Sequence, residues 1–335
     1  MKTLPRIAIS IGDPAGVGAE IALKALSDKT VAPLAQWLLI ADSAALYAAA
    51  RIAGIDPSTL SCKLVEASNL PKNHVLAFGQ LRAEYGLAAI DYVRRATELC
   101  LTGGADAMVT APLNKEAVSL SGSAFSGHTE FIAKLTGATE SRMLLVSEKL
   151  ATVHVSTHIP LEWACQLDRK RIVRTIQLGN DALQLMLQRP PRIAVCGINP
   201  HAGEHGLFGT QDAAVIVPAV AEARALGINC SGPYSPDTIF VRAVRGEFDL
   251  VVAMYHDQGH IPMKLIDFEA TVNVSLGIPI IRTSVDHGTA FDIAGHNIAD
   301  PTNMKAAMKL AVRMATGKLA LKAHTNTHRS AKAIR

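Results

Sequence analysis

Short apolar segments alternate with longer amphipathic segments along almost the whole chain. The short segments are apolar at consecutive positions, which is typical of strands that are buried on both faces. They predict strands at residues 6–11, 37–41, 107–110, 143–146, 152–156, 193–197, 250–255 and 271–276. The amphipathic segments predict helices at residues 19–26, 44–53, 87–101, 168–187, 211–226 and 301–316. This alternation predicts an α/β fold with a mainly parallel sheet that is covered by helices on both faces.

The chain has 335 residues, which is typical of two domains or of one large α/β unit. No segment repeats at a fixed period, and no Ser/Gly-rich linker divides the chain. We therefore expect two lobes that share elements instead of two domains joined by a linker.

The composition is that of a globular protein with a substantial core. Hydrophobic residues make up 49% of the chain and charged residues 19%, which argues against general disorder. Aromatic residues make up only 4%, which argues against a nucleic-acid surface built on base stacking. The apolar runs are far shorter than the roughly 20 residues of a membrane helix, and Gly12-Asp13-Pro14 interrupts the first of them. We expect a soluble, cytoplasmic protein that binds neither nucleic acid nor a membrane.

The net charge of +4 comes from the C-terminal end of the sequence. The last 18 residues contain five Lys or Arg and no Asp or Glu, so the rest of the chain is nearly neutral. This distribution argues against a polyanion-binding protein but allows a small anionic substrate to be held by a local group of cations. The five cysteines are scattered without CxxC spacing, so the sequence predicts neither a disulfide framework nor a thiolate metal site.

Three of the predicted strands each lead directly into a histidine. The three are His158 after residues 152–156, His201 after residues 193–197 and His256 after residues 250–255. Ligands of open α/β sheets bind at the carboxyl ends of the strands, and imidazole is a preferred ligand of divalent transition metals. Three protein ligands leave positions open for a substrate, so we expect a three-histidine metal site. His154 lies inside a predicted strand and is expected to pack in the core.

A second group of polar residues suits a phosphate or a carboxylate. The segment Ser126-Gly127-His128-Thr129-Glu130 opens a predicted helix, and the free N–H groups at a helix start attract anions. Lys264 and Arg282 can donate charge-assisted hydrogen bonds, and Asn273 lies in a predicted strand between them. Each residue alone would also suit an ordinary structural role.

The glycine-rich segment at residues 12–18 follows a predicted strand and precedes a predicted helix. Its spacing is neither that of the GxGxxG dinucleotide motif nor that of a P-loop. Taken alone, it predicts a tight turn, and the spacing of glycines predicts no nucleotide cofactor.

Five segments resemble the PdxA family, whose namesake is the 4-hydroxythreonine-4-phosphate dehydrogenase of pyridoxal phosphate biosynthesis. The segments are Gly12-Asp13-Pro14-Ala15-Gly16-Val17-Gly18, Ser126-Gly127-His128-Thr129-Glu130, Asn199-Pro200-His201-Ala202-Gly203-Glu204, Met254-Tyr255-His256-Asp257-Gln258-Gly259 and Arg282-Thr283-Ser284-Val285-Asp286-His287-Gly288-Thr289-Ala290. The resemblance extends over residues 6–315 with the motifs in the order of the family. Residues 287–295 are also similar to the nucleotide-binding loop of isopropylmalate and isocitrate dehydrogenases, which hold NAD or NADP without a Rossmann glycine motif.

The resemblance implies the fold of the isocitrate and isopropylmalate dehydrogenases, with two α/β lobes, mainly parallel sheets and an active-site cleft between the lobes. The first lobe would comprise residues 1–130 and 268–335 with the nucleotide loop. The second would comprise residues 131–267, with the metal-ligand loops and the dimer contacts. The family also implies a homodimer in which the active site is shared between the subunits.

The resemblance further implies a role for individual residues. The metal ligands would be His158, His201 and His256. The substrate contacts would be His128, Thr129, Lys264, Asn273 and Arg282, and the contacts to NAD or NADP would be His287, Gly288, Thr289 and Asp292. Asp237 matches an acidic residue near the metal, and Asp237 and Lys115 are the candidates for the catalytic base. Lys115 would equally suit a salt-bridged helical lysine, and Asp237 a turn or N-cap residue.

The implied reaction is a metal-dependent, NAD- or NADP-linked oxidation of the C3 hydroxyl of a small 4-phosphorylated hydroxy acid, followed by decarboxylation. One divalent ion, Zn, Mg or Co, would favour loss of the hydroxyl proton and would stabilise the charge that develops as CO₂ leaves. In the namesake branch the substrate is 4-phosphohydroxy-L-threonine and the product is 3-amino-2-oxopropyl phosphate.

Several alternatives remain open at this point. Residues 256–264 and 111–116 look more like a second branch, which converts D-threonate or D-erythronate 4-phosphate to dihydroxyacetone phosphate. These substrates differ from that of the namesake chiefly at C2, hydroxyl against amino, and no residue of the sequence identifies that group. A third branch, the dihydrodiol dehydrogenases of aromatic dicarboxylates, fits less well because the phosphate-type residues are retained. A non-redox metal-dependent hydrolase or lyase and a phosphometabolite-binding protein are the alternatives of another class.

Overall fold

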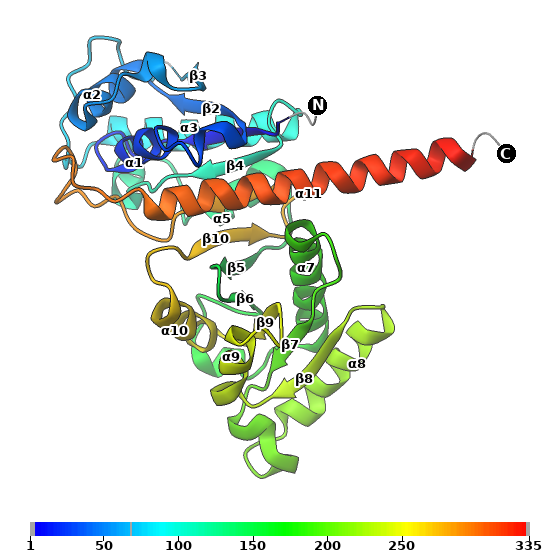
Figure 1. Cartoon of the computed structure of the whole chain (residues 1–335). Coiled ribbons are helices and arrows are strands. Elements are labelled where there is room, and N and C mark those ends of the chain that lie inside the picture. Colours follow the sequence, from blue (N-terminus) through cyan, green and yellow to red (C-terminus); the bar gives the residue numbers. More distant parts are fainter. Residues whose placement is uncertain (1–3, 68, 333–335) are drawn as a thin grey trace. The chain divides into compact units, whose positions relative to one another are not determined.

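The computed structural model describes residues 4–67 and 69–332, with side chains up to residue 321. The described chain forms two compact units (Figure 1). Unit 1 contains residues 4–141 and 277–315, and unit 2 contains residues 142–276 and 316–332. The chain therefore divides after Ser141, Leu276 and Ala315, whereas the lobes expected from the resemblance divide only after residues 130 and 267.

Unit 1 contains a parallel sheet with the strand order β3-β2-β1-β4-β11. Its strands are β1 (Arg6–Ser10), β2 (Gln36–Ala41), β3 (Cys62–Glu66), β4 (Ala107–Thr110) and β11 (Arg282–Ser284). Its helices are α1 (Gly18–Leu26), α2 (Ser43–Ala53), α3 (Ala83–Leu101), α4 (Lys115–Leu120) and α5 (His128–Thr136). The long helix α11 (Thr302–Lys332) begins in this unit and is drawn in red in Figure 1.

Unit 2 contains strands in the order β10-β5-β6-β9-β7-β8. They are β5 (Arg142–Val146), β6 (Ala151–His154), β7 (Ile193–Cys196), β8 (Cys230–Tyr234), β9 (Leu250–Ala253) and β10 (Val272–Leu276). The helices are α6 (Leu161–Ala164), α7 (Arg169–Leu187), α8 (Val217–Ala225), α9 (Pro236–Val244) and α10 (His256–Ile266). The β10–β5 and β5–β6 pairs are antiparallel and the other pairs parallel, so the prediction of a mainly parallel α/β protein is confirmed.

The predicted strands and helices are all present, with shifted ends. β4, β6, β7 and β9 are buried at every residue, as their continuous apolar sequences predicted. The pattern did not predict β3, β8 and β11, which stand at the ends of the two orders above. β8 contains Gly232 and Pro233, and proline is tolerated in a sheet at an edge, where its missing N–H group disrupts no hydrogen bond.

Two segments have a different local structure from the one expected. Residues 256–259 were expected in a loop, but α10 begins at His256. The expected helix at residues 211–226 is divided into a π-helical turn (Asp212–Ile216) and α8. Within the part of the chain that the structure describes, we found no helix that is both long enough and apolar enough to span a membrane.

The glycine-rich segment after β1 forms a tight turn around the carboxyl group of Asp13. Gly12 has φ +71°, and a Cβ atom on it would lie 2.0 Å from the carbonyl oxygen of Pro112. Oδ1 of Asp13 accepts a hydrogen bond from the N–H group of Ala15 at 2.9 Å. Oδ2 of Asp13 is buried and has no hydrogen-bond partner in the described part of the chain. Burial raises the pKa of Asp13 to about 6, although the N–H groups of Ala15 and Asn114 act to lower it.

We predict that Asp13→Asn stabilises the protein at alkaline pH. A pKa raised from 3.8 to about 6 means that the folded state favours the protonated carboxyl. Asp13 therefore stabilises the fold below about pH 4 and loses this contribution as the pH rises through about 6. At pH 8 the variant should be more stable by about 1–3 kcal/mol, since each pKa unit corresponds to about 1.4 kcal/mol. Urea unfolding of both proteins at pH 4 and pH 8 measures the difference.

Asp56→Asn is the matched control for this prediction. Oδ1 of Asp56 accepts the N–H group of Ser58 at 2.9 Å, as Asp13 does with Ala15, but Asp56 is in a solvent-exposed turn. The N–H group of Ser58 lowers the pKa of Asp56, so this substitution should destabilise the protein at pH 8. An unchanged difference in stability between Asp13→Asn and the wild type from pH 4 to pH 8 would contradict the assignment of Asp13.

Candidate functional site

A buried guanidinium lies in the sheet of unit 1. Arg282 is the first residue of β11 and is 3% exposed. Its Nη2 and Nε atoms donate to Oγ1 of Thr110, at 2.7 and 3.2 Å. Burial lowers the pKa of Arg282 to about 10, and the nearby carboxylate of Glu130 opposes this shift. Arg282 is therefore still a cation at neutral pH.

His128 lies beside this cation at the first turn of α5. Its Nε2 atom is buried and has no hydrogen-bond partner among the described residues. Burial lowers the pKa of His128 well below 6.5, and the charges of Arg282 and Lys115 lower it further. The ring is therefore neutral at neutral pH. The N-cap residue of this helix is Gly127, which has no side chain with which to cap the first N–H groups.

These groups form what we call the anion cluster: Arg282, Lys115, His128 and the start of α5. Thr129 follows His128 in the first turn of this helix. Lys115 is the exposed first residue of α4 and forms no ion pair with any described residue, so the structure does not support a salt-bridged helical lysine. Two cations, a helix N-terminus and an unpartnered buried imidazole nitrogen suit a phosphate group.

The expected nucleotide loop follows β11 in the same unit. His287 and Asp292 are exposed, and Nδ1 of His287 lies 2.9 Å from the carbonyl oxygen of Gly288. The carbonyl oxygen of Thr289 accepts the N–H group of Val17 at 3.1 Å. This contact joins the loop to the glycine-rich turn after β1, so the two segments that resemble the family motifs pack together.

In unit 2, two of the predicted metal ligands are neighbours. The ring centres of His158 and His256 are 5.7 Å apart. Nδ1 of His256 donates to Oδ1 of Asp257 at 2.6 Å, which leaves Nε2 as the nitrogen with a free lone pair in the neutral ring. A histidine whose other nitrogen donates to a carboxylate is the usual form of a histidine metal ligand. This pair of imidazoles therefore fits a divalent transition metal.

His201 forms a second pair in unit 2, with Asp237. His201 lies in the turn at Pro200–Gly206, and Asp237 lies in the first turn of α9. The hydroxyl of Ser235 donates to Oδ1 of Asp237 at 2.6 Å and lowers the pKa of this carboxyl, and His201 lowers it further. Among the residues that the structure describes, no three His, Cys, Asp or Glu side chains are grouped to hold a metal ion. One chain thus brings two of the three predicted ligands together, His158 and His256, while the third, His201, lies near Asp237.

The sequence analysis did not predict that the rings of His256, His260 and His154 contact one another in series. The ring of His260 stacks on that of His256 at 3.6 Å, and the ring of His154 is 4.6 Å from His260. His154 is fully buried, which confirms that it packs in the core, and burial lowers its pKa to about 3. The i,i+4 spacing of His256 and His260 would have indicated one helix face, but this segment was expected to be a loop.

The remaining predicted substrate contacts, Lys264 and Asn273, belong to unit 2. Lys264 is exposed on α10, and its Nζ atom lies 5.1 Å from the ring centre of Phe268. Asn273 is half-buried in β10, opposite Leu145 of β5. The expected contacts to one substrate are thus divided between the two units.

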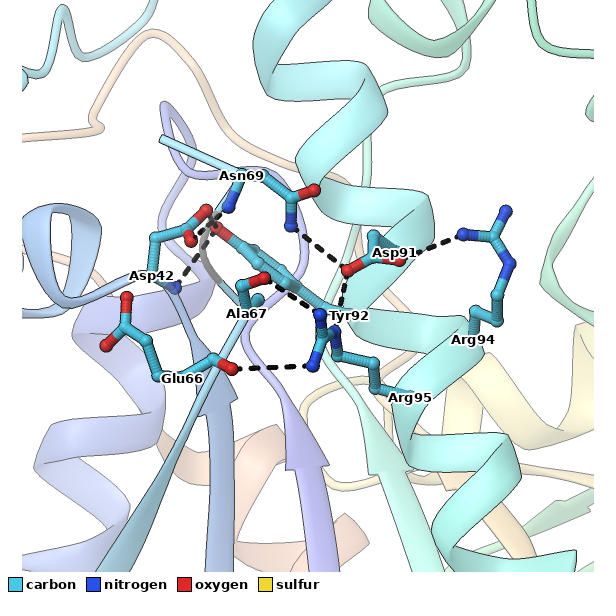
Figure 2. Close-up of polar contacts among 8 residues, drawn as sticks. All are labelled: Asp42, Glu66, Ala67, Asn69, Asp91, Tyr92, Arg94 and Arg95. Atoms are coloured by element: carbon cyan, nitrogen blue, oxygen red, sulfur yellow. Dashed lines mark hydrogen bonds and ion pairs between the residues drawn. The ribbon is translucent and has the colours of Figure 1, made fainter. Parts of the chain in front are cut away.

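A further polar cluster in unit 1, after β2 and β3, has a structural role (Figure 2). Asp42 accepts the hydroxyl of Tyr92 and the N–H group of Asn69, both at 2.7 Å. Asp91 accepts hydrogen bonds from Arg94, Arg95 and the Asn69 amide. Both carboxylates are thus hydrogen-bonded within the protein, and these bonds hold two loops against α3.

Comparisons with known proteins identify the family. The family model described as "Pyridoxal phosphate biosynthetic protein PdxA" matches residues 33–311. The chain is 45% identical to the D-threonate 4-phosphate dehydrogenase of Cupriavidus necator, over 93% of this chain and 98% of that protein. It is 43% identical to the 4-hydroxythreonine-4-phosphate dehydrogenase of Geobacter metallireducens, over 94% and 96% of the two chains.

Solved structures of the same family are also similar to this chain. The crystal structure of a 4-hydroxythreonine-4-phosphate dehydrogenase from Burkholderia phymatum superposes with a TM-score of 0.83 at 44% identity, covering 93% of this chain and 99% of that one. The EutD phosphotransacetylase of Staphylococcus aureus shares the fold alone, with a TM-score of 0.57 at 13% identity. Relatives named dehydrogenases imply an oxidoreductase with a nicotinamide cofactor. The resemblance is confirmed: this chain belongs to the PdxA family.

Proposed function

We propose that the protein oxidises the C3 hydroxyl of a 4-phosphorylated hydroxy acid with NAD or NADP and then releases CO₂. The main candidate substrate is 4-phosphohydroxy-L-threonine, and the second candidate is D-threonate or D-erythronate 4-phosphate. The observation that carries the proposal is the anion cluster around Arg282 and His128, in a chain whose relatives are named for 4-phosphorylated substrates.

The anion cluster would hold the phosphate group. Arg282 and Lys115 supply positive charge, and the N-terminal end of the α5 dipole favours an anion. The neutral ring of His128 can donate one hydrogen bond from Nε2, which has no other partner in the described chain. Thr129, Lys264 and Asn273 complete the set of substrate contacts that we propose.

The histidines of unit 2 would hold one divalent ion, Zn, Co or Mg, of which imidazole ligands favour the first two. His158 and His256 already lie together, and we assign His201 as the third ligand. When bound, such an ion lowers the pKa of a substrate hydroxyl and stabilises developing negative charge. Asp237, whose pKa is lowered by the Ser235 hydroxyl, is ionised at neutral pH and is our candidate to accept the hydroxyl proton.

We also propose the two-lobed organisation of the isocitrate and isopropylmalate dehydrogenases. The phosphate contacts of unit 1 and the histidines of unit 2 would then act on one substrate in the cleft of that fold. Residues 287–292 would bind the nicotinamide cofactor, with His287, Gly288, Thr289 and Asp292 as contacts. Since NAD and phosphorylated acids are intracellular metabolites, we propose that the enzyme acts in the cytoplasm.

The exposed apolar side chains of unit 2 support a homodimer. Ile261 and Leu265 lie one turn apart on α10 and are 55% and 82% exposed, and Phe268 follows at 66%. Large exposed apolar side chains that gather on one face mark interaction surfaces. The same helix begins with His256, and the resemblance to the family implies an active site that is shared between the subunits. We propose that the partner subunit completes the metal site.

The oxidation itself is tested by the absorbance of the reduced cofactor at 340 nm. We expect the signal to rise with NAD or NADP and a 4-phosphorylated acid, to stop on addition of a chelator and to return with Co²⁺ or Zn²⁺. A comparison of phosphohydroxythreonine, D-threonate 4-phosphate and D-erythronate 4-phosphate identifies the substrate. Protein that retains its metal but reduces neither cofactor with any of the three acids would refute the proposal.

The dimer is tested by Leu265→Glu, which places a charge in the exposed apolar surface of α10. We expect the variant to be a folded monomer with little activity, because charge is poorly tolerated at the centre of an interface. Light scattering on a sizing column gives the mass, and circular dichroism checks the fold. Leu87→Glu, at a 48% exposed position of α3 in unit 1, is the control and should stay dimeric. A fully active wild-type monomer would contradict the shared site.

A further inference from the structure

The turn that carries His201 has a backbone conformation that L-amino acids rarely adopt. Residues 201–205 all have φ between 38° and 83°, and among these five only Gly203 is a glycine. The left-handed region brings the Cβ atom of an L-residue close to the following carbonyl oxygen, so a run of such residues is strained. Strained backbone persists only where the surrounding contacts determine it, and it is common at functional sites.

One buried carboxylate, that of Asp212, determines the start of this turn. Asp212 is 1% exposed, and its Oδ1 atom accepts the N–H group of Ile198 at 2.9 Å. Its Oδ2 atom accepts the N–H group and the side-chain amide of Asn199, at 3.2 and 2.8 Å. The carbonyl oxygen of Asn199 then accepts the N–H group of Ala202 at 3.1 Å. Asp212 is thereby linked to Asn199, before His201, and through the Asn199 carbonyl to the left-handed Ala202 after it.

The turn also closes tightly around the carboxylate. A Cβ atom on Gly197 would lie 2.7 Å from Oδ1 of Asp212 and 2.8 Å from the Cα atom of Ala202. A Cβ atom on Gly203 would lie 3.3 Å from Oδ2 of Asp212. Asp212 is also the first residue of the π-helical turn, a structure that is frequent at functional sites. Two irregular segments therefore meet at one side chain.

We propose that Asp212 is the positioning residue for His201. The hydrogen bonds of its carboxylate stabilise the left-handed conformation of residues 201–205 and so fix the position of the His201 imidazole. This inference rests on the proposed function, in which His201 is a metal ligand. Asp212 acts through the backbone: its oxygens are occupied by the N–H groups of Ile198 and Asn199 and by the Asn199 amide.

The test is Asp212→Asn, which keeps the size of the side chain and replaces one acceptor oxygen by an N–H donor. Co²⁺ is added to metal-free protein, and its binding is followed by visible absorption. We expect Co²⁺ to bind 10- to 100-fold more weakly than to the wild type, as is usual when the support of a metal ligand is lost, with a changed absorption spectrum. Asp212→Glu retains the carboxylate and should recover part of the affinity.

Asp249→Asn is the matched control in the same unit. Asp249 accepts hydrogen bonds from the side chains of Arg189 and Arg192 and from the N–H group of Arg192 at 2.8 Å. This variant loses a comparable network that does not involve the turn of His201, so it should be less stable and yet bind Co²⁺ as the wild type does. His201→Ala gives the affinity expected when the ligand itself is missing.

The outcomes separate the inference from the proposed function. A wild-type protein that binds no Co²⁺ would remove the metal site and the inference together. Equal Co²⁺ affinity of the wild type and folded Asp212→Asn, with weak binding by His201→Ala, would overturn the positioning role alone. If Asp212→Asn does not fold, Gly203→Ala replaces it, since a Cβ atom at φ +83° strains the same turn while Asp212 stays. Wild-type Co²⁺ affinity in Gly203→Ala would then overturn the inference.

Discussion

The burial of a positive charge in unit 1 is the constraint on which the proposed chemistry depends. A buried guanidinium is costly unless hydrogen bonds and opposite charge compensate for its lost hydration. Thr110 and Glu130 supply part of this compensation to Arg282. Lys115 and the start of α5 add further positive potential around His128. A doubly charged phosphate would add opposite charge, and it would anchor the substrate through C4, next to the C3 carbon that is oxidised.

Unit 2 contributes imidazole side chains. The ring of His256 stacks on that of His260, which in turn contacts the ring of His154. Asp257 accepts a hydrogen bond from His256 and so orients its ring. His201 is presented by a strained turn that Asp212 holds in place. The two histidine supports differ in kind, since one is a stack of rings and the other a hydrogen-bonded carboxylate. Both restrict an imidazole to one orientation, which a metal ligand requires.

The sequence predicted the fold better than it predicted the local structure around the candidate site residues. Continuous apolar runs predict buried strands, so the histidines that follow those strands were found by position alone. The edge strand β8 was missed because its Gly232-Pro233 sequence is atypical of a strand. The left-handed turn at His201 and the proposed role of Asp212 depend on contacts between residues 13 and 14 positions apart, which no local pattern encodes. Only the resemblance to the family led to the proposal of a nucleotide loop, since the spacing of the glycines predicted no nucleotide cofactor.

The account is tested most directly by the contribution of Arg282 to phosphate recognition. Isothermal titration can compare a 4-phosphorylated acid with its dephosphorylated form on the wild type and on Arg282→Gln. We predict that the wild type binds the phosphorylated form far more tightly and that Arg282→Gln loses most of this difference, while the weak binding of the dephosphorylated acid is unchanged. A folded Arg282→Gln variant that still prefers the phosphorylated acid to the full extent would contradict the account.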